Sequence, residues 1–190
     1  MPFRPDLLFH ETLSGPMALG RRDTGHPARH GRTTRLSLHA TIRIDSLEDF
    51  LLDPEHVAWL GGHLSFPPFS KCLPVREGRF QLFSPSDDPL MRLMHYDARF
   101  EHEGRTYFLS GTKFLRDDPG PDLWTDTTRL LTTLHEGHDD RGPVVAAGVL
   151  SVGVRELLAL MASMRSPRGG PQTLVRFGRF FLGNLWELYA

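Results

Sequence analysis

Lys113 is the residue whose type and position point most directly to chemistry. The chain has only two lysines, Lys71 and Lys113, and Lys113 lies in a strand-like run between apolar neighbours. A lysine amine inside a protein is costly unless it is paired, and burial can turn it into a base or a Schiff-base nucleophile. The structural alternative is an ion pair with Asp126 or Glu136 on the neighbouring strand. Lys113 is therefore a candidate either for ligand contact or for an ion pair.

The predicted hairpin around Lys113 and the loop after it supply the other candidate site residues. Tyr96 lies on the strand opposite Lys113, and a buried tyrosine hydroxyl needs a hydrogen-bond partner or a cavity. If this face is the interior, Lys113, Tyr96 and Asp126 form a polar cluster that orients a ligand carbonyl or hydroxyl. If the other face of the return strand is the interior, Phe108 and Phe114 line the pocket. The candidate ligand-binding residues are Tyr96, Lys113, Trp124, Asp126, Phe108 and Phe114.

The rest of the sequence contains no familiar catalytic or cofactor motif. There is no GxSxG, GxGxxG, GxxxxGK[ST], HExxH or CxxC string. Residues 135–140 read HEGHDD and are rich in metal-ligand types, but they straddle a strand end and a glycine turn, so the side chains need not converge. We therefore predict a solvated turn there, no metal site and no bound cofactor.

Composition limits the classes of protein that the chain can represent. With 190 residues, 39% of them hydrophobic, the chain has the size and apolar content of one domain with a core. With a net charge of −1, the chain has no overall positive charge that would attract nucleic acid. No apolar run is long enough to span a membrane, and the first residues do not resemble a signal peptide. The single cysteine, Cys72, suits a reducing compartment. We expect a cytoplasmic protein without a nucleic-acid partner.

Hydrophobic periodicity predicts mostly strands. Apolar and polar residues alternate from Leu36 to Ile44, which is typical of a half-buried strand, and a short helix with an acidic first turn follows. Residues 90–117 read as two long strands joined by a tight turn. Apolar residues at helical spacing predict helices over 154–164 and 173–189.

Strands joined by short turns pair antiparallel, and several of them are apolar on both faces. The sequence therefore predicts a mainly β (α+β) fold: an antiparallel, closed or nearly closed β-barrel with a short helix after the first strand and two C-terminal helices. Residues 1–34, which show no sustained period, are predicted to be an extended N-terminal segment. Residues 35–190 are predicted to form a single barrel domain.

Several segments resemble a known bacterial protein region. They are FHETLSG, IDSLEDFLLDPEHVAWLGGHL, EGRFQLF, YFLSGTKFLRDDPGPDLWTDTT and VRFGRFFLGNLWELYA. Over nearly the whole chain and in this order they resemble the accessory, non-flavin region associated with glucose-methanol-choline oxidoreductases of the cholesterol-oxidase-like type. The nucleotide-binding fingerprint of the flavin domain is missing, so the resemblance implies neither flavin nor oxidase chemistry. It implies an association with lipid-like or steroid-like molecules.

Three functional hypotheses follow. The first is a lipocalin-like barrel that binds a small apolar molecule of lipid, steroid or polyketide type, as a standalone accessory module; thirteen Phe and six Met suit its lining. The second is a cofactor-independent cyclase or isomerase that acts on a polyene or polyketide inside the same barrel. The third is a docking module whose partner is a flavin oxidoreductase.

Overall fold

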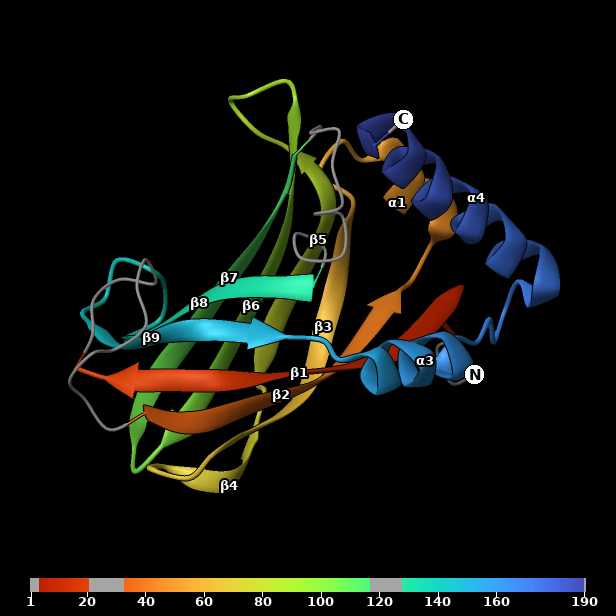
Figure 1. The fold of residues 1–190 in the computed structure, drawn as a ribbon. Coiled ribbons are helices and arrows are strands. Elements are labelled where there is room, and N and C mark those ends of the chain that lie inside the picture. The colour runs from red at the N-terminus through yellow and green to blue at the C-terminus, as the bar shows by residue number, and fades with distance from the viewer. Residues whose placement is uncertain (1–3, 21–32, 117–127, 190) are drawn as a thin grey trace.

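The computed structural model describes residues 4–20, 33–116 and 128–189, and antiparallel strands dominate it (Figure 1). The strands are β1 (Leu7–Leu19), β2 (Thr33–Ile44), β3 (Val57–Phe66), β4 (Ser70–Pro74), β5 (Glu77–Pro85), β6 (Met91–His102), β7 (Arg105–Arg116), β8 (Arg129–Glu136) and β9 (Val144–Ser151). The helices of the described residues are α1 (Leu47–Leu52), α3 (Val154–Ser163) and α4 (Gly170–Tyr189).

Eight of these strands close into an antiparallel barrel. The strand order is β2-β1-β9-β8-β7-β6-β5-β3-β4, and a further pairing of β2 with β3 joins the two ends of the sheet. β4 lies outside the ring, because it pairs with the His63–Phe66 part of β3 while β5 pairs with the Val57–Trp59 part. The predicted fold class, a closed antiparallel barrel with a short helix and two C-terminal helices, is confirmed.

Alternation of side chains between the two faces of each strand builds the core. In β2, the residues Leu36, Leu38, Ile42 and Ile44 are buried while their neighbours are more accessible. The predicted 90–117 hairpin is also confirmed, and β6 and β7 pair from Met91–Arg116 to His102–Arg105. Inward residues of all eight ring strands meet in one hydrophobic core.

The N-terminal segment departs from the prediction, because β1 is a full member of the barrel. Over most of its length β1 pairs with β2, and it also pairs with β9 between Ser14 and Leu19. The predicted division at residue 35 therefore does not separate the barrel from what precedes it. A second difference is β4, a short strand that the hydrophobic periodicity does not predict.

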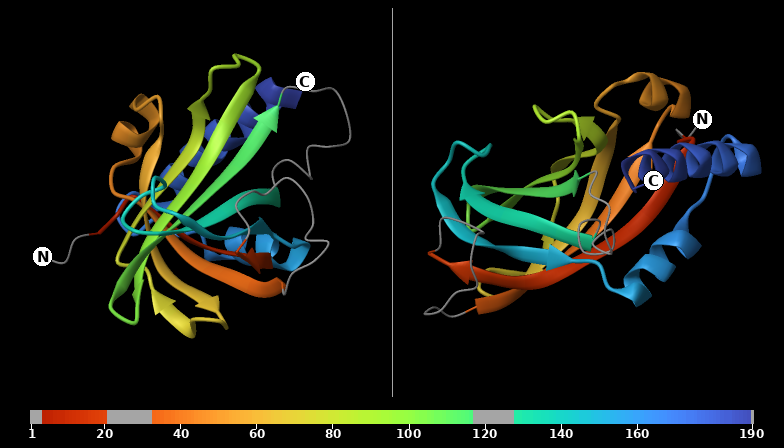
Figure 2. Two further views of the ribbon diagram at one scale, coloured as in Figure 1. Left: turned by 90° about the vertical axis from the view of Figure 1, so that its left-hand side faces the viewer. Right: turned by 45° about the horizontal axis from the view of Figure 1, so that its top comes forward.

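Helices α1, α3 and α4 all lie at one end of the barrel (Figures 1 and 2). Ser46 caps α1 by accepting a hydrogen bond from the Asp49 amide, as the sequence around it favours. Helix α4 packs its Phe177 into the core, in contact with Phe9 of β1 and Phe50 of α1. None of the described helices is long and apolar enough to cross a membrane.

Candidate functional site

Three polar side chains from three strands meet inside the barrel: Glu11 of β1, Tyr96 of β6 and Lys113 of β7. The Tyr96 hydroxyl donates a hydrogen bond of 2.7 Å to Glu11 Oε2. The Lys113 ammonium lies 3.3 Å from Glu11 Oε1 and 5.1 Å from the centre of the Tyr96 ring. Their exposed fractions are 5%, 2% and 3%, in the same order. We call this set the interior triad.

Strand alternation and register explain why these residues face inward. Lys113 is two residues from Leu115 and four from Leu109, and both leucines are fully buried. Tyr96 is paired with Gly111, and the neighbouring inward pair on the same two strands is Met94 with Lys113. Of the two faces of β7 that the sequence left open, the one that carries Lys113 faces the barrel interior, and Tyr96 of β6 faces the same interior.

Glu11 is the member of the triad that sequence reasoning missed. It occupies an inward position of β1 between buried Phe9 and Leu13, opposite Ala40 of β2. The pattern in β1 gives a weak signal of a strand because Glu11 and Gly15 stand at positions where an apolar side chain is expected. The alternation Leu7, Phe9, Leu13, Met17 is the signal that could have identified the strand.

The surroundings of the triad determine the protonation of Tyr96 and the hydrogen bonds that Lys113 can donate. Burial, the charge of Glu11 and the hydrogen bond to Glu11 all raise the pKa of Tyr96 well above its ordinary value, so the phenol stays protonated and donates. An ammonium has three N–H donors. Glu11 is the hydrogen-bond acceptor that the described residues offer to Lys113. Among the described residues, the Lys113 ammonium therefore has donor capacity beyond its bond to Glu11.

Such a pair is not explained by stability alone. Transferring two charges out of water costs several kcal/mol each, and replacing a buried ion pair by apolar residues is often neutral or stabilising. The neighbourhood of Lys113 is apolar, with Met94, Leu109, Leu115 and Leu130 all buried. The buried pair is therefore a candidate functional site.

Phe108 and Phe114, two of the other predicted site residues, do not join the triad. Phe108 and Phe114 lie on the outer face of β7, and Phe114 is 43% exposed. Trp124 and Asp126 lie outside the described residues. Glu136, offered as an ion-pair partner of Lys113, instead pairs with Arg105 at 3.1 Å. Lys113 is in an ion pair, as the structural alternative expected, and its partner among the described residues is Glu11 rather than Glu136.

A cluster of aromatic rings separates the interior triad from helix α4. Phe80 contacts the Tyr96 ring edge-on at 4.9 Å between ring centres, and Phe9 contacts Phe80 at 6.4 Å. Phe9 in turn contacts Phe177 of α4 at 6.2 Å. The triad is thus linked by edge-to-face and tilted ring contacts to the helix at this end of the barrel.

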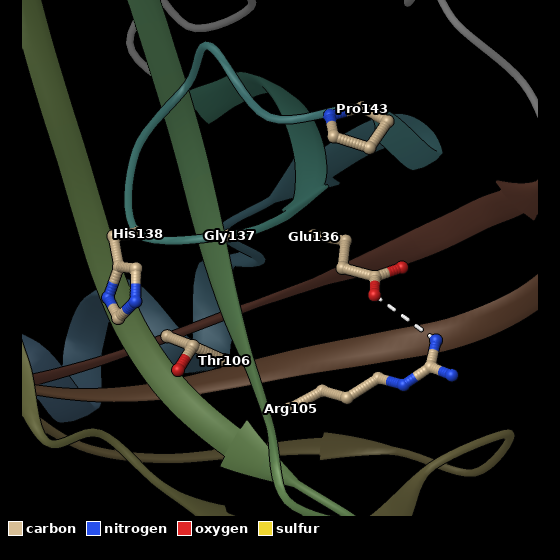
Figure 3. Close-up of a pocket in the computed structure, with 6 residues that line it drawn as sticks. All are labelled: Arg105, Thr106, Glu136, Gly137, His138 and Pro143. Atoms are coloured by element: carbon tan, nitrogen blue, oxygen red, sulfur yellow. Dashed lines mark hydrogen bonds and ion pairs between the residues drawn. The ribbon is translucent and has the colours of Figure 1, made fainter.

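An open depression lies away from the triad, where the β6–β7 turn meets the β8–β9 loop (Figure 3). Its volume is about 420 Å³, and it is lined by Arg105, Thr106, Glu136, Gly137, His138 and Pro143. The Arg105 guanidinium donates a hydrogen bond to the Glu136 carboxylate. Within the described residues no group of three or more His, Cys, Asp or Glu side chains is placed to hold a metal ion.

Histidines on the outer face of the barrel make stability depend on pH. His39 of β2 stacks on His63 of β3 at 4.6 Å between ring centres and is 3.2 Å from Thr12 Oγ1. Burial, and then the charge of His63, lower the pKa of His39. Burial also lowers the pKa of His95, against an opposing effect of the Asp97 charge. Protonation of these histidines is therefore less favourable in the folded state than in the unfolded state.

The pKa values of His39 and His95 are lower in the folded state than in the unfolded state. The free energy of unfolding is therefore highest above the unfolded pKa of about 6.5, and it decreases as the pH falls below that value. We expect urea unfolding to show lower stability at about pH 5.5 than at about pH 7, and His39→Gln to reduce this difference. His138→Gln, at an exposed histidine, is the matched control. An unchanged pH dependence in His39→Gln would show that His39 does not contribute.

Comparison with known proteins gives no match to a protein-family model, to a curated protein or to a solved structure.

Proposed function

We propose that this barrel binds a small apolar molecule that carries a carbonyl group, and that the interior triad holds the carbonyl oxygen. The observation that carries the proposal is the buried ion pair of Glu11 and Lys113, with Tyr96 on the second carboxylate oxygen. The Lys113 ammonium would donate a hydrogen bond to the ligand, while the apolar inward side chains around it would contact the ligand body.

The charge of the triad favours a neutral acceptor over an anion. With Glu11 ionised and Lys113 protonated, the pair has no net charge. A bound carboxylate would leave a net negative charge in an apolar interior, which is costly. A ketone or aldehyde oxygen accepts a hydrogen bond without adding charge. The resemblance of the chain to the accessory region of cholesterol-oxidase-like oxidoreductases supports a lipid-like or steroid-like ligand, and a role as a standalone accessory module.

A second candidate function uses the same residues for catalysis. A carboxylate beside an ammonium can take a proton from the carbon next to a carbonyl while the ammonium stabilises the developing charge on oxygen. Glu11 and Lys113 have this arrangement, which supports a cofactor-independent cyclase or isomerase as the alternative. The third hypothesis, a docking module for a flavin oxidoreductase, has no support in the interior triad.

The proposal predicts that affinity for apolar ketones depends on Lys113. We expect the protein to bind 2-decanone or progesterone more tightly than decane, and Lys113→Met to weaken ketone binding about tenfold or more, since it removes a charged hydrogen-bond donor. The measurement is isothermal titration calorimetry. The same substitution at the only other lysine, Lys71→Met on exposed β4, should leave affinity unchanged.

A second variant separates loss of binding from loss of folding. Lys113→Met leaves Glu11 buried without its cation, so Glu11→Gln/Lys113→Met is measured beside it, with thermal unfolding of both. Equal ketone affinity in the wild type and in both folded variants would contradict the proposal. Recovery of the ligand with an altered structure or with deuterium from D₂O would favour the cyclase or isomerase over simple binding.

A further inference from the structure

The interior triad joins strands from opposite walls of the barrel. Around the closed ring the strand order is β2-β1-β9-β8-β7-β6-β5-β3. β6 is therefore four strands away from β1, which is half of the ring, and β7 is three strands away. The hydrogen bonds from Tyr96 and Lys113 to Glu11 thus cross the barrel interior. The amine of Lys113 lies within that interior, where a molecule bound inside the barrel would meet it.

A lysine amine in this position can do more than donate a hydrogen bond. Its nitrogen can add to a carbonyl carbon and form an imine, and lysines removed from water are the ones that proteins use for this reaction. Lys113 is buried, whereas Lys71, the other lysine of the chain, is exposed. A carbonyl group whose oxygen accepts a hydrogen bond from Lys113 has its carbon next to the same nitrogen. Holding the reacting atoms together in this way favours the reaction.

We propose that Lys113 binds an apolar aldehyde covalently, as an imine whose counter-ion is Glu11. This inference rests on the proposed function, because it takes the same site and the same ligand carbonyl one chemical step further. An aldehyde suits the step better than a ketone, because its carbonyl carbon has one carbon substituent and is less hindered. Met94, which pairs with Lys113 in the strand register, and Leu115 are buried apolar neighbours, so the rest of the ligand has to be apolar as well.

The Glu11 carboxylate can carry the protons that the reaction moves. Lys113 Nζ lies 3.3 Å from Glu11 Oε1, so the ammonium can pass one proton to the carboxylate and become a neutral amine. The amine nitrogen then adds to the carbonyl carbon, and a proton moves from nitrogen to oxygen to give a carbinolamine. Glu11 returns its proton to the carbinolamine hydroxyl, the C–O bond breaks and water leaves. The products are a protonated imine, the Glu11 carboxylate and one molecule of water.

The reaction leaves the net charge of the barrel interior unchanged. An ammonium faces a carboxylate before the reaction, and a protonated imine faces the same carboxylate after it. An additional charge in an apolar interior is costly, and none is created here. The Tyr96 hydroxyl donates to Glu11 Oε2 at 2.7 Å, so it holds the carboxylate while Oε1 exchanges the proton. The interior triad therefore contains a nucleophile, a proton carrier and a counter-ion.

The test is reductive trapping of the folded protein with decanal. The protein is incubated with an equimolar amount of decanal and with sodium cyanoborohydride, which reduces an imine to a stable secondary amine. Mass spectrometry of the digested protein then locates the adduct. We expect about tenfold more adduct on Lys113 than on Lys71, although Lys71 is the exposed lysine. Both lysines belong to the same molecule, so this comparison needs no substitution. An excess of 2-decanone should slow trapping at Lys113 and leave trapping at Lys71 unchanged.

Lys113→Arg separates the covalent step from simple binding. Arginine keeps the positive charge and the hydrogen-bond donors, but its guanidinium stays protonated and does not form the imine. The variant should bind 2-decanone about as tightly as the wild type and should lose the adduct at this position. Lys71→Arg is the matched control and should be trapped at Lys113 like the wild type. Glu11→Gln should slow trapping at Lys113 about tenfold, because the amide cannot accept the proton. Thermal unfolding shows which variants are folded.

The outcomes distinguish this inference from the proposed function. Binding of 2-decanone without preferential trapping at Lys113 would overturn the imine and leave the proposed function standing. Preferential trapping at Lys113 without measurable ketone binding would support the covalent site and contradict reversible binding. If the protein neither binds 2-decanone nor is trapped preferentially at Lys113, both proposals are wrong.

Discussion

Replacing Glu11 by leucine is expected to lower the free energy of unfolding by about 3–5 kcal/mol, because it leaves one charge of a buried pair without its partner. Lys113 would keep its ammonium inside the barrel, and the Tyr96 hydroxyl would lose its acceptor at the same time. Urea unfolding at neutral pH, followed by tryptophan fluorescence, measures the effect.

The double variant Glu11→Leu/Lys113→Met tests the cause. It removes both charges, so it should recover a large part of the stability that Glu11→Leu loses. Glu136→Leu breaks the more exposed pair with Arg105 and should cost no more than about 1 kcal/mol. If the double variant is as unstable as Glu11→Leu, the carboxylate stabilises the fold through Tyr96 rather than through Lys113.

The second large effect is expected at Phe177 of helix α4. Its ring is 3% exposed and lies 6.2–6.3 Å from the ring centres of Phe9, Phe50, Phe180 and Phe181. Phe177→Ala removes most of this contact and leaves a cavity, which should cost about 3–5 kcal/mol. The midpoint and slope of urea unfolding give the measured value.

An exposed residue of the same helix provides the comparison. Leu182→Ala truncates a side chain that is 65% exposed, and its effect should stay within about 0.5 kcal/mol. Similar small losses for both variants would show that α4 separates from the barrel before the barrel unfolds. A large loss for Phe177→Ala alone would establish that α4 folds with the barrel as one unit.

The fold was largely predictable because the strands have strong local patterns. The alternation from Leu36 to Ile44 and the residues 90–117 predict β2 and the β6–β7 hairpin, and the structure has both. β1 was missed because Glu11 and Gly15 interrupt its apolar period. β4 was missed because its five residues lie between two prolines and a tight turn, and four of them are not fully buried.

The interior triad was predictable only in part. Tyr96 and Lys113 belong to one hairpin, so a period of two places them on a common face. Glu11 reaches them across 85 and 102 residues of sequence, through a barrel closure that no local pattern encodes. The face of β7 that carries Phe108 and Phe114 could not be assigned from sequence, because both faces of that strand contain aromatic or aliphatic side chains.

Barrel closure through β1 has a consequence for the order of events during synthesis. β1 and β2 are neighbours in the chain and can pair early as a hairpin, but β1 gains its second partner only from β9. The bond between Ser14 and Ser151 spans 137 residues, so all of these residues must be synthesised before that edge is covered. Until then the nascent chain carries an unpaired strand edge and an acidic residue on its apolar face. Folding of the barrel is therefore expected to be slow, with the exposed edge of β1 as the site where premature association begins.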